Sequence, residues 1–498
     1  MYILGIDIGT TNSKAGLFKQ DGTMVAIASR PTQTYYLENG VAYYDPEQMW
    51  QSMASCIQEV TEKAGKPQIA SIGIASMAES GLLIDRASGK PRSMFMPWFD
   101  QCSKPQSDFI MSQSDAFENF RRSGLHGSFK LGLAKLLWLR EQQPEAFGGS
   151  VWLSASGYIA YRLTGQMAFD YSLAARTYAF SMERKAWDEA WLKQFGFDAS
   201  IMPQVLPSGT VLGGVLPEVS EALGLTTATK VAIAGHDHVA AALAVGSITP
   251  GVVYDSMGTA ETLVGTLEEK ELGRQEFEAG LSFGCHIAKD RYFWMGGNSA
   301  SGGSVEWLRG LLADEQMSYE TLLGLLEQVK PGPTGILYYP YLTGSGAPAP
   351  DSKAKAAWIG LTKEHGKADM IKALLEGTAY QLEAIRRVAE GISGRSIERL
   401  LVVGGGTRNP QWLQVKANIT RCVLDIPPIS EATLLGAALA AGIGSGVYGS
   451  AEEASQAVAG QESRMVEPQP ELIGPYRKLY DEGYMALQQS LRAFYRTL

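Results

Sequence analysis

The 498-residue sequence has few of the residues that form disulfides, zinc sites or basic binding surfaces. Its four cysteines include no C-x-x-C pair, which argues against a disulfide framework and against a structural zinc site. Among the five histidines, His236 and His238 form one cluster, but no third metal ligand is evident. The net charge is −9 without a cluster of Lys and Arg. We therefore expect neither nucleic acid nor an anionic membrane as the main partner.

Long hydrophobic runs are also missing from the sequence. No stretch approaches the ~20 apolar residues of a membrane span. Met1 leads directly into a strand-like segment, without the basic region and apolar core of a signal peptide. We therefore expect a cytoplasmic protein. With 45% hydrophobic and 19% charged residues the composition is that of a globular protein, and the length predicts two or three domains.

The two common glycine-rich nucleotide motifs are absent or out of context. The G-x-x-x-x-G-K-[ST] pattern of a P-loop does not occur in the sequence. The segment 444–449 matches G-x-G-x-x-G, but it follows an alanine-rich helical pattern where a dinucleotide site requires a strand. We interpret this segment as a loop.

Two strand–turn–strand patterns are the most informative feature that is present. The first covers residues 2–18 and contains Asp7-Ile8-Gly9-Thr10-Thr11, and the second covers residues 251–264 and contains Asp255-Ser256-Met257-Gly258-Thr259. Glycine in each turn lets the backbone approach a ligand closely, and the threonine hydroxyl and N–H groups can converge on anionic oxygens. One such hairpin alone would be read as an ordinary tight turn. Two copies, each at the start of a long α/β segment, predict a phosphate clamp.

Strand-like and helical patterns alternate along the chain, which predicts an α/β fold. The glycine- and proline-containing stretch 244–251 is expected to separate two halves. This division gives domains 1–246 and 247–445, followed by a helical extension, 446–498, packed on the second domain. The main helices are expected at 46–64, 131–141, 154–163, 239–245 and 369–390, and the main strands at 69–75, 230–234, 292–295 and 400–403.

Turns at the ends of strands are candidate ligand sites, because open α/β sheets bind ligands at the carboxyl ends of their strands. Such turns are expected at 76–81, 235–238 and 404–410. The last of these begins with Gly404-Gly405-Gly406, so no Cβ blocks the approach of a phosphate or of the flat face of a nucleobase.

Taken in order, these motifs resemble those of the FGGY family of carbohydrate kinases. The resemblance covers about residues 1–445, and it implies a duplicated actin/hexokinase/Hsp70-like (ribonuclease H-like) α/β fold of two domains with a cleft between them. It also implies ATP and Mg²⁺ as cofactors and a small sugar or polyol as substrate, and it permits a homodimer. The motifs are Asp7–Thr11, Pro97-Trp98-Phe99-Asp100, Gly235-His236-Asp237, Gly258-Thr259, Gly344–Asp351 running on to Gly360-Leu361-Thr362, and Gly404-Gly405-Gly406 with Asn409.

The same resemblance implies roles for single residues. Asp7 matches the acid that holds Mg²⁺, and Asp237 matches the general base that accepts the proton of the sugar hydroxyl. The positions expected to contact the sugar are Glu79, Trp98, Asp100 and Asp237. Those expected to bind ATP are Thr10, Thr11, Lys14, Gly258, Thr259, Gly302, Gly405, Gly406 and Asn409.

The sequence leaves several alternatives open. Asp237 could cap the helix that follows it, Glu79 could be a solvated loop acid, and Trp98 could be a core residue. The chain lacks the arginine that many relatives carry two residues after Asp100, and Ser76-Met77-Ala78-Glu79 matches neither the Gln-Met-His of xylulokinases nor the Gln-Arg-Glu of glycerol kinases. The substrate therefore stays open among ketoses and alditols of four to six carbons, glycerol and gluconate. An actin- or Hsp70-like ATPase without a sugar substrate is the alternative from another class.

Overall fold

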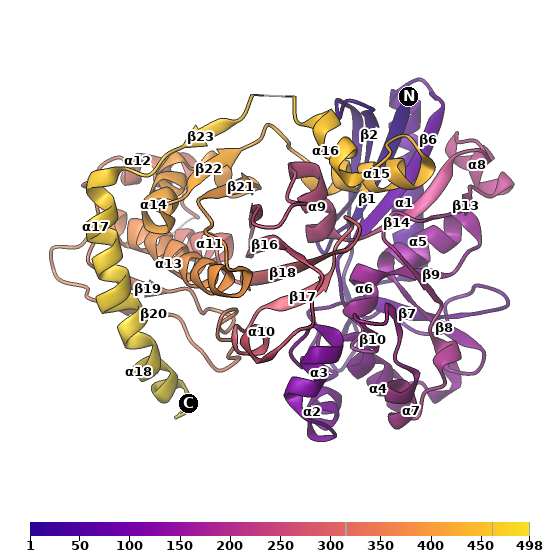
Figure 1. Cartoon of the computed structure of the whole chain (residues 1–498), viewed down its shortest axis with the longest axis horizontal. Coiled ribbons are helices and arrows are strands. Elements are labelled where there is room, and N and C mark those ends of the chain that lie inside the picture. The colour runs from indigo at the N-terminus through magenta and orange to yellow at the C-terminus, as the bar shows by residue number, and fades with distance from the viewer. Residues whose placement is uncertain (314–315, 461, 498) are drawn as a thin grey trace.

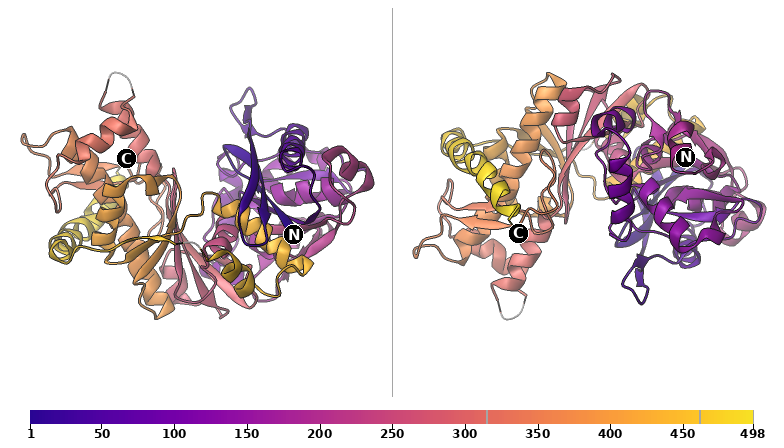
Figure 2. Two further views of the ribbon diagram at one scale, coloured as in Figure 1. Left: turned by 90° about the horizontal axis from the view of Figure 1, so that it is seen from above. Right: turned by 90° about the horizontal axis from the view of Figure 1, so that it is seen from below.

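The protein is described by a computed structural model for residues 1–313, 316–460 and 462–497 (Figure 1). Its elements form two lobes, each built around a β-sheet, and the two views of Figure 2 separate them clearly. The first lobe is coloured indigo to magenta, and the second is mostly pink to orange. The alternating strands and helices therefore give the two-lobed α/β architecture that the sequence predicts.

In the described residues the first sheet has the strand order β13-β14-β6-β1-β2-β3. Strand β1 pairs with β2 in antiparallel and with β6 in parallel orientation, and β6 pairs in parallel with β14. Ile8 and His236 are both in register with Ser76, so the carboxyl ends of β1, β6 and β14 meet at one edge of the sheet. The strands are β1 (Tyr2–Ile8), β2 (Asn12–Lys19), β3 (Met24–Pro31), β6 (Ile69–Ser76), β13 (Val211–Gly214) and β14 (Lys230–His236).

The second sheet repeats this scheme with the order β17-β18-β16-β15-β21-β22-β23, again within the described ranges. Its hairpin β15–β16 is antiparallel, and β15 pairs in parallel with β21. Ser256 lies opposite Val403, which brings the turn after β15 beside the turn after β21. The strands are β15 (Val253–Met257), β16 (Glu261–Glu268), β17 (Ser282–Cys285), β18 (Arg291–Asn298), β21 (Arg399–Val403), β22 (Val423–Ile426) and β23 (Arg464–Val466).

Helices and short strand pairs surround the two sheets. The expected helices form with ends that differ by a few residues. The helices of the first lobe are α1 (Pro46–Lys63), α2 (Lys104–Ser112), α3 (Ala116–Ser123), α4 (Gly132–Gln142), α5 (Ala155–Thr164), α6 (Tyr171–Ala175), α7 (Glu189–Gln194), α8 (Pro217–Leu223) and α9 (Asp237–Val245). Those that follow include α10 (Arg274–Glu278), α11 (Gly302–Leu311), α12 (Tyr319–Leu326), α13 (Lys367–Ser393) and α14 (Pro410–Thr420). The short strand pairs are β4 (Tyr35–Tyr36) with β5 (Ala42–Tyr43), β7 (Gly81–Asp85) with β8 (Ser150–Ser154), β9 (Ala168–Asp170) with β12 (Gln204–Leu206), β10 (Phe180–Ser181) with β11 (Ala186–Trp187), and β19 (Leu337–Tyr339) with β20 (Ala357–Ile359).

Helix α15 (Ala432–Ser445) comes from the second half of the sequence but packs on the first sheet, against β1, β6 and α9. Two strand glycines permit this contact. A Cβ on Gly5 would lie 1.8 Å from the carbonyl oxygen of Leu434, and one on Gly73 would lie 1.7 Å from that of Ala437. Only glycine fits at such a distance, so the helix backbone lies directly on the strands.

The segment expected as one extension on the second domain is divided between the lobes. Helix α16 (Ala451–Val458) packs instead on α15 and α9 of the first lobe, where its apolar residues join the same buried cluster. Helices α17 (Pro470–Leu479) and α18 (Ala486–Tyr495) extend over the second lobe, where buried tyrosines of this segment pack with α13, β19 and α14. The chain thus returns to the first lobe for α15 and α16, and it crosses to the second lobe once more before β23.

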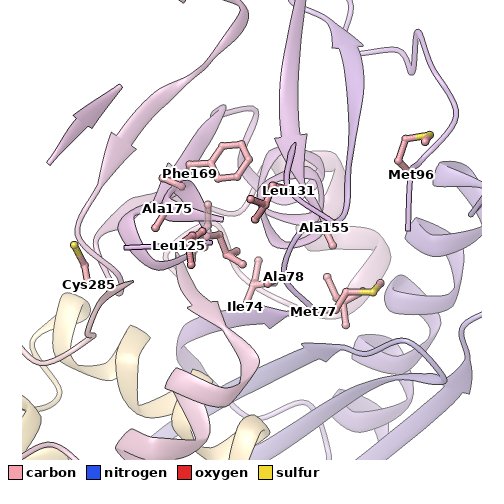
Figure 3. Packing of buried hydrophobic residues seen from close by; sticks show 14 of the residues in the cluster. Ile74, Met77, Ala78, Met96, Leu125, Leu131, Ala155, Phe169, Ala175 and Cys285 are labelled. Carbon is pink, nitrogen blue, oxygen red and sulfur yellow. The ribbon is translucent and has the colours of Figure 1, made fainter. Parts of the chain in front are cut away.

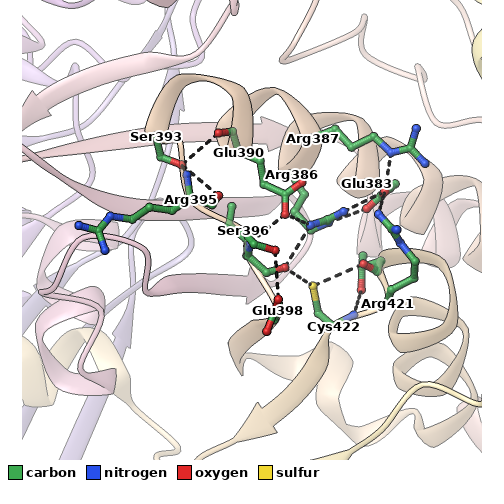
Figure 4. A network of polar contacts seen from close by, with 12 residues as sticks. Glu383, Arg386, Arg387, Glu390, Ser393, Arg395, Ser396, Glu398, Arg421 and Cys422 are labelled. Atoms are coloured by element: carbon green, nitrogen blue, oxygen red, sulfur yellow. Dashed lines mark hydrogen bonds and ion pairs between the residues drawn. The ribbon is translucent and has the colours of Figure 1, made fainter.

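A buried polar network anchors the start of β21 (Figure 4). Arg386 of α13 donates from Nε to Glu383 at 2.7 Å and from Nη1 to the carbonyl of Ile397 at 3.1 Å. Glu390 accepts the N–H of Ile397 at 2.8 Å, and the Cys422 thiol donates to the Ile397 carbonyl at 3.0 Å. Because Ile397 lies just before β21, the network fixes the strand whose other end carries the glycine-rich turn.

Two sequence expectations can be compared directly with the described residues. Among the described residues, no helix combines the length and the apolar character that a membrane span requires. The four cysteines form no disulfide there, and three of them are buried.

Candidate active site

Three acids lie at the carboxyl edge of the first sheet. Asp7 is the next-to-last residue of β1, Glu79 lies in the turn between β6 and β7, and Asp237 begins α9 directly after β14. Asp7 and Asp237 are close enough that the negative charge of Asp237 raises the pKa of Asp7. The strand register therefore gathers carboxylates that are far apart in the sequence.

The Asp237 carboxylate is held from one side only. Its Oδ1 accepts the backbone N–H of His238 at 2.7 Å and lies 3.2 Å from Nε2 of His236. Burial lowers the pKa of His236 to about 3, so its imidazole is neutral beside the carboxylate. Oδ2 receives no hydrogen bond from the described residues. The helix cap itself is His236, so Asp237 is not the N-cap that the sequence left open.

Asp7 is the acid with the most unfavourable surroundings. Its Oδ1 is buried without a hydrogen-bond partner in the described structure. Burial, together with the charges of Asp237 and Glu431, raises the pKa of Asp7 to about 8, although Lys14 acts in the opposite direction. A divalent cation at this point would relieve the repulsion, and carboxylate oxygen is a ligand that Mg²⁺ prefers. The residues present therefore fit the expected metal.

The turn of the first hairpin carries the expected phosphate contacts. Its backbone is closed by a hydrogen bond from the N–H of Gly9 to the carbonyl of Asn12 at 3.0 Å. Thr11 is exposed in this turn, and the half-buried Thr10 accepts the indole N–H of Trp98 at 2.8 Å. Trp98 thus connects the sugar-side segment to the hairpin and is not merely a core residue.

Lys14 is held by an acid in this structure. It lies in β2 opposite Asp7, and its Nζ is 2.9 Å from both carboxylate oxygens of Glu431, the residue before α15. The side chain of Lys14 is 27% exposed. A phosphate that binds Lys14 must therefore compete with Glu431.

The other sugar-side acids are also engaged. Arg176, which follows α6, donates to Oε1 of Glu79 from Nε at 2.6 Å and again from Nη2. Glu79 is therefore not a solvated loop acid. Asp100 accepts the backbone N–H of Ala42 at 2.7 Å and that of Cys102 at 2.8 Å, so both of its oxygens brace the loop.

Buried apolar residues pack together next to Glu79 in the sequence, and Figure 3 shows their cluster. Met77 and Ala78 precede Glu79 and are buried together with Ile74 of β6 and Leu131, which precedes α4. The polar side chains of the site therefore stand on a packed core, which limits how far they can move.

The remaining expected ATP contacts form a second cluster in the other lobe. Gly258 and Thr259 lie in the turn between β15 and β16, and the N–H of Gly302 donates to the Gly258 carbonyl at 3.2 Å. A Cβ on Gly302 would lie 2.4 Å from that oxygen. The glycine-rich turn adjoins the same hairpin, because a Cβ on Gly406 would lie 2.8 Å from the methyl group of Met257.

Gly405 and Asn409 belong to the same glycine-rich turn. Gly405 begins a short 3₁₀ turn, and a Cβ there would meet nothing within 4 Å. Asn409 is fully buried and caps α14, since its Oδ1 accepts the N–H of Trp412 at 3.0 Å. Its Nδ2 has no partner among the described residues.

The two clusters meet where α9 packs on β15 and β16. Burial raises the pKa of Tyr254 in β15, and the negative charges of Asp237 and Asp7 raise it further. Both acids of the first lobe therefore lie near the second hairpin, as a clamp around one phosphate chain requires.

Several residues of the site were not identified from the sequence. Arg176, Lys130 and Glu431 belong to no motif that was recognised, and each reaches the site from a loop or helix end that is distant in sequence. His236 was noted as half of an H-x-H pair and as part of the Gly235-His236-Asp237 motif, without a role of its own. The described residues contain no group of three or more acids, histidines or cysteines that could hold a metal ion, so the pair is not part of such a site.

The sequence and fold both match known carbohydrate kinases. The N-terminal domain model of the FGGY family of carbohydrate kinases matches residues 2–244, and the C-terminal domain model matches residues 253–445. The chain is 29% identical to a xylulose kinase of Bacillus subtilis over 485 residues, which is 96% of this chain and 95% of the relative. It is 28% identical to a gluconokinase of the same organism, with 88% and 86% covered.

Solved structures agree with the fold. The crystal structure of xylulose kinase from Rhodospirillum rubrum superposes with a TM-score of 0.89 at 26% identity over 100% of both chains. Gluconate kinase from Lactobacillus acidophilus gives a TM-score of 0.91 at 23% identity, covering 100% of this chain and 99% of the other, and supports the fold alone. The protein belongs to the FGGY family of carbohydrate kinases and is a phosphotransferase with the two-domain actin/hexokinase-like fold.

Proposed function

We propose that the protein transfers the γ-phosphoryl group of ATP to a terminal hydroxyl of a small sugar or polyol. The observation that carries the proposal is the environment of Asp237. One of its carboxylate oxygens accepts the backbone N–H of His238 and lies 3.2 Å from Nε2 of His236, and the other is left without a hydrogen bond from the described residues at the edge where the phosphate hairpin and the sugar-side residues meet. A carboxylate fixed in this way can accept a proton from a hydroxyl placed beside it.

In the proposed reaction Asp237 takes the proton of the acceptor hydroxyl. The oxygen forms a bond to the γ-phosphorus while the bond from that phosphorus to the bridging oxygen breaks, which yields the sugar phosphate and ADP. The transition state is loose, so placing the hydroxyl in line contributes more than strong basicity. The backbone N–H of His238 serves this purpose, because its hydrogen bond fixes the orientation of the carboxylate.

The ATP phosphates would lie between the two hairpins. The N–H and hydroxyl groups of Thr10 and Thr11 would approach them from one side, and those of Gly258 and Thr259 from the other. Lys14 would leave Glu431 to neutralise charge on the phosphates. Mg²⁺ would be held at Asp7 and would supply positive charge beside the transferred group.

The test is ADP release with Mg·ATP across ketoses, alditols, glycerol and aldonates, compared with a reaction that lacks an acceptor. We expect one compound class to raise ADP production far above that control. ADP release that is the same with every acceptor and with none would contradict the proposal and favour an ATPase without a sugar substrate.

The role of Asp237 has its own test. Asp237→Asn should lower kcat by about 10²–10⁴-fold while the Kd for ATP changes little. The matched control is Asp115→Asn, since Asp115 caps the exposed start of α3 and asparagine caps as well as aspartate. Near-normal turnover in Asp237→Asn would exclude it as the base.

Two further expectations remain predictions. The homodimer that the family resemblance permits can be tested by light scattering of the purified protein. A cytoplasmic location can be tested by fractionating the cells that produce it.

A further inference from the structure

The sugar side of the site contains two cations to which the proposed function gives no role. Arg176 contacts Glu79, and Nζ of Lys130 lies 4.9 Å from the ring centre of Trp98. Trp98 in turn donates to Thr10 of the phosphate hairpin. A chain of contacts therefore leads from the phosphate hairpin across the indole to the ammonium group of Lys130.

Hydrogen bonds from buried side chains fix the backbone around Lys130. The fully buried Lys135 of α4 donates from Nζ to the carbonyl of Lys130 at 2.5 Å and approaches that of Phe129 at 3.5 Å. Ser103 also donates to the Phe129 carbonyl at 2.8 Å. The loop before α4 is thus held in place, and the position of Lys130 beside the indole is built into the fold.

Neither nearby acid makes a hydrogen bond to Lys130. Glu79 is already bonded to Arg176, and both oxygens of Asp100 accept backbone N–H groups. Nζ of Lys130 makes no hydrogen bond or ion pair within the described residues, and Nη1 of Arg176 is buried without a partner. Burial and the charge of Arg176 lower the pKa of Lys130, although the charge of Glu79 acts in the opposite direction.

Glu79 itself is held in a conformation that favours this arrangement. Its φ is 54°, in the left-handed region that residues other than glycine rarely adopt. The two hydrogen bonds from Arg176 fix the carboxylate in that position. One carboxylate therefore faces two cations, Arg176 and Lys130, which leaves an excess of positive charge at this end of the site.

We infer that Lys130 is a specificity-determining residue that binds a carboxylate of the substrate, so that the preferred acceptor is a small polyhydroxylated acid of the aldonate class. This inference rests on the proposed kinase function and names the substrate class of the same site. The hydroxyl that is phosphorylated lies at Asp237, and the acid group lies at the other end of the carbon chain, at the ammonium group of Lys130.

The energetic argument is a difference between two kinds of ligand. A neutral ketose or alditol that fills the site would remove water from Lys130 without supplying a counter-charge. A carboxylate would supply that charge and a charge-assisted hydrogen bond. Sites built around a buried polar group reject ligands that leave it unpaired, so the preference for the acid should be large.

The experiment compares acceptors of equal carbon number that differ in the end group: five- and six-carbon aldonates against the corresponding alditols and ketoses. We expect kcat/KM of the wild-type protein to be about 10²-fold higher for an aldonate. Lys130→Met should remove most of that ratio, mainly by raising KM for the acid, because binding of the carboxylate is the same in the ground state and the transition state. Lys130→Arg keeps the charge and should keep the preference.

The controls separate this inference from the kinase proposal. Lys363→Met changes a lysine whose side chain is 92% exposed and should leave the ratio as in the wild type. If the wild-type protein phosphorylates neutral ketoses or alditols best, or if Lys130→Met lowers activity toward acids and neutral acceptors equally, the inference is wrong while the kinase function stands. If no compound raises ADP release above the control, the proposed function itself fails. The melting temperature of each variant is measured to exclude loss of folding.

Discussion

The two hairpins have the same plan but differ in the partners of their acids. Asp7 and Asp255 each have one buried oxygen without a hydrogen bond in the described structure, but of the two only Asp255 is also bonded to a cation. In the first hairpin neither oxygen of Asp7 receives a hydrogen bond from the described residues, and the nearest cation, Lys14, is bonded to Glu431. In the second hairpin Asp255 is bonded to the buried Lys416 of α14 at 2.6 Å. The same ammonium group also bonds to Glu261.

The difference indicates which copy carries the metal chemistry. A carboxylate beside a fixed ammonium group is neutralised and serves as a structural tie, whereas a buried carboxylate without a partner is free for a cation. In the proposed function the first hairpin therefore carries the acid that would hold Mg²⁺.

The sharpest test exchanges each acid for its amide. Asp7→Asn should lower kcat at saturating Mg·ATP by about 10²–10³-fold. Its melting temperature should stay equal or rise, because the substitution removes a carboxyl group whose ionised form is disfavoured by burial and by the charges of Asp237 and Glu431. Asp255→Asn should show the opposite pattern. It should change kcat little but lower stability, since Lys416 loses a partner. Equal losses of activity in the two variants would show that both hairpins contribute an acid to the reaction.

Removing the ammonium group of the second hairpin tests the structural tie directly. Lys416→Met should lower the free energy of unfolding by about 3–5 kcal/mol, because Asp255 and Glu261 are both left buried without it. Urea unfolding measures the change. The triple variant that also carries Asp255→Asn and Glu261→Gln should recover part of the loss, and a triple variant less stable than Lys416→Met would contradict the ion-pair explanation.

The contrast between the hairpins also shows what can be predicted from sequence. Both turns, their glycines and the strands around them were predicted, because alternation and turn residues are local signals. The state of each acid was not predicted, since Lys416 and Glu431 lie far along the chain from the acids that they affect. Asp237 was found only through the order of motifs, because a helix cap and a base look alike in sequence.

The same limit applies to the substrate side. The sequence indicated that an arginine was missing after Asp100, and the fold brings Arg176 to Glu79 from a short helix that follows β9. Lys130 carried no local signal at all, because its contact with Trp98 depends on how the loop before α4 folds. The packing of α15 and α16 on the first lobe was missed for a similar reason, since it depends on strand glycines such as Gly5.

A smaller effect is expected at the ion pair of the first hairpin. Lys14→Met should raise KM for Mg·ATP by about 10-fold, because a charge-assisted contact with a phosphate is lost. Glu431→Gln should lower that KM by a few-fold, since Lys14 no longer has to leave a carboxylate. Steady-state kinetics with a fixed acceptor measures both. If both variants shift KM in the same direction, Glu431 does not compete with the phosphate for Lys14.

The smallest effect compares the buried histidines of the two lobes through the pH dependence of stability. Burial lowers the pKa of His286, in the second lobe, to about 4, as it lowers that of His236 in the first. Between about pH 6.5 and 4 the unfolded chain binds a proton at His286 that the folded protein does not, so stability is lost as the pH falls through this window.

Urea unfolding between pH 7 and 4.5 gives the slope of stability against pH. His286→Asn keeps an acceptor for the N–H of Ala288 and should reduce that slope by up to one proton, or about 1.4 kcal/mol per pH unit. His365→Asn, at a half-exposed position of the same lobe, is the control. An unchanged slope in His286→Asn would mean that this imidazole is protonated without unfolding. The acid sensitivity of the protein would then arise elsewhere, with His236 beside the proposed base as the next residue to test.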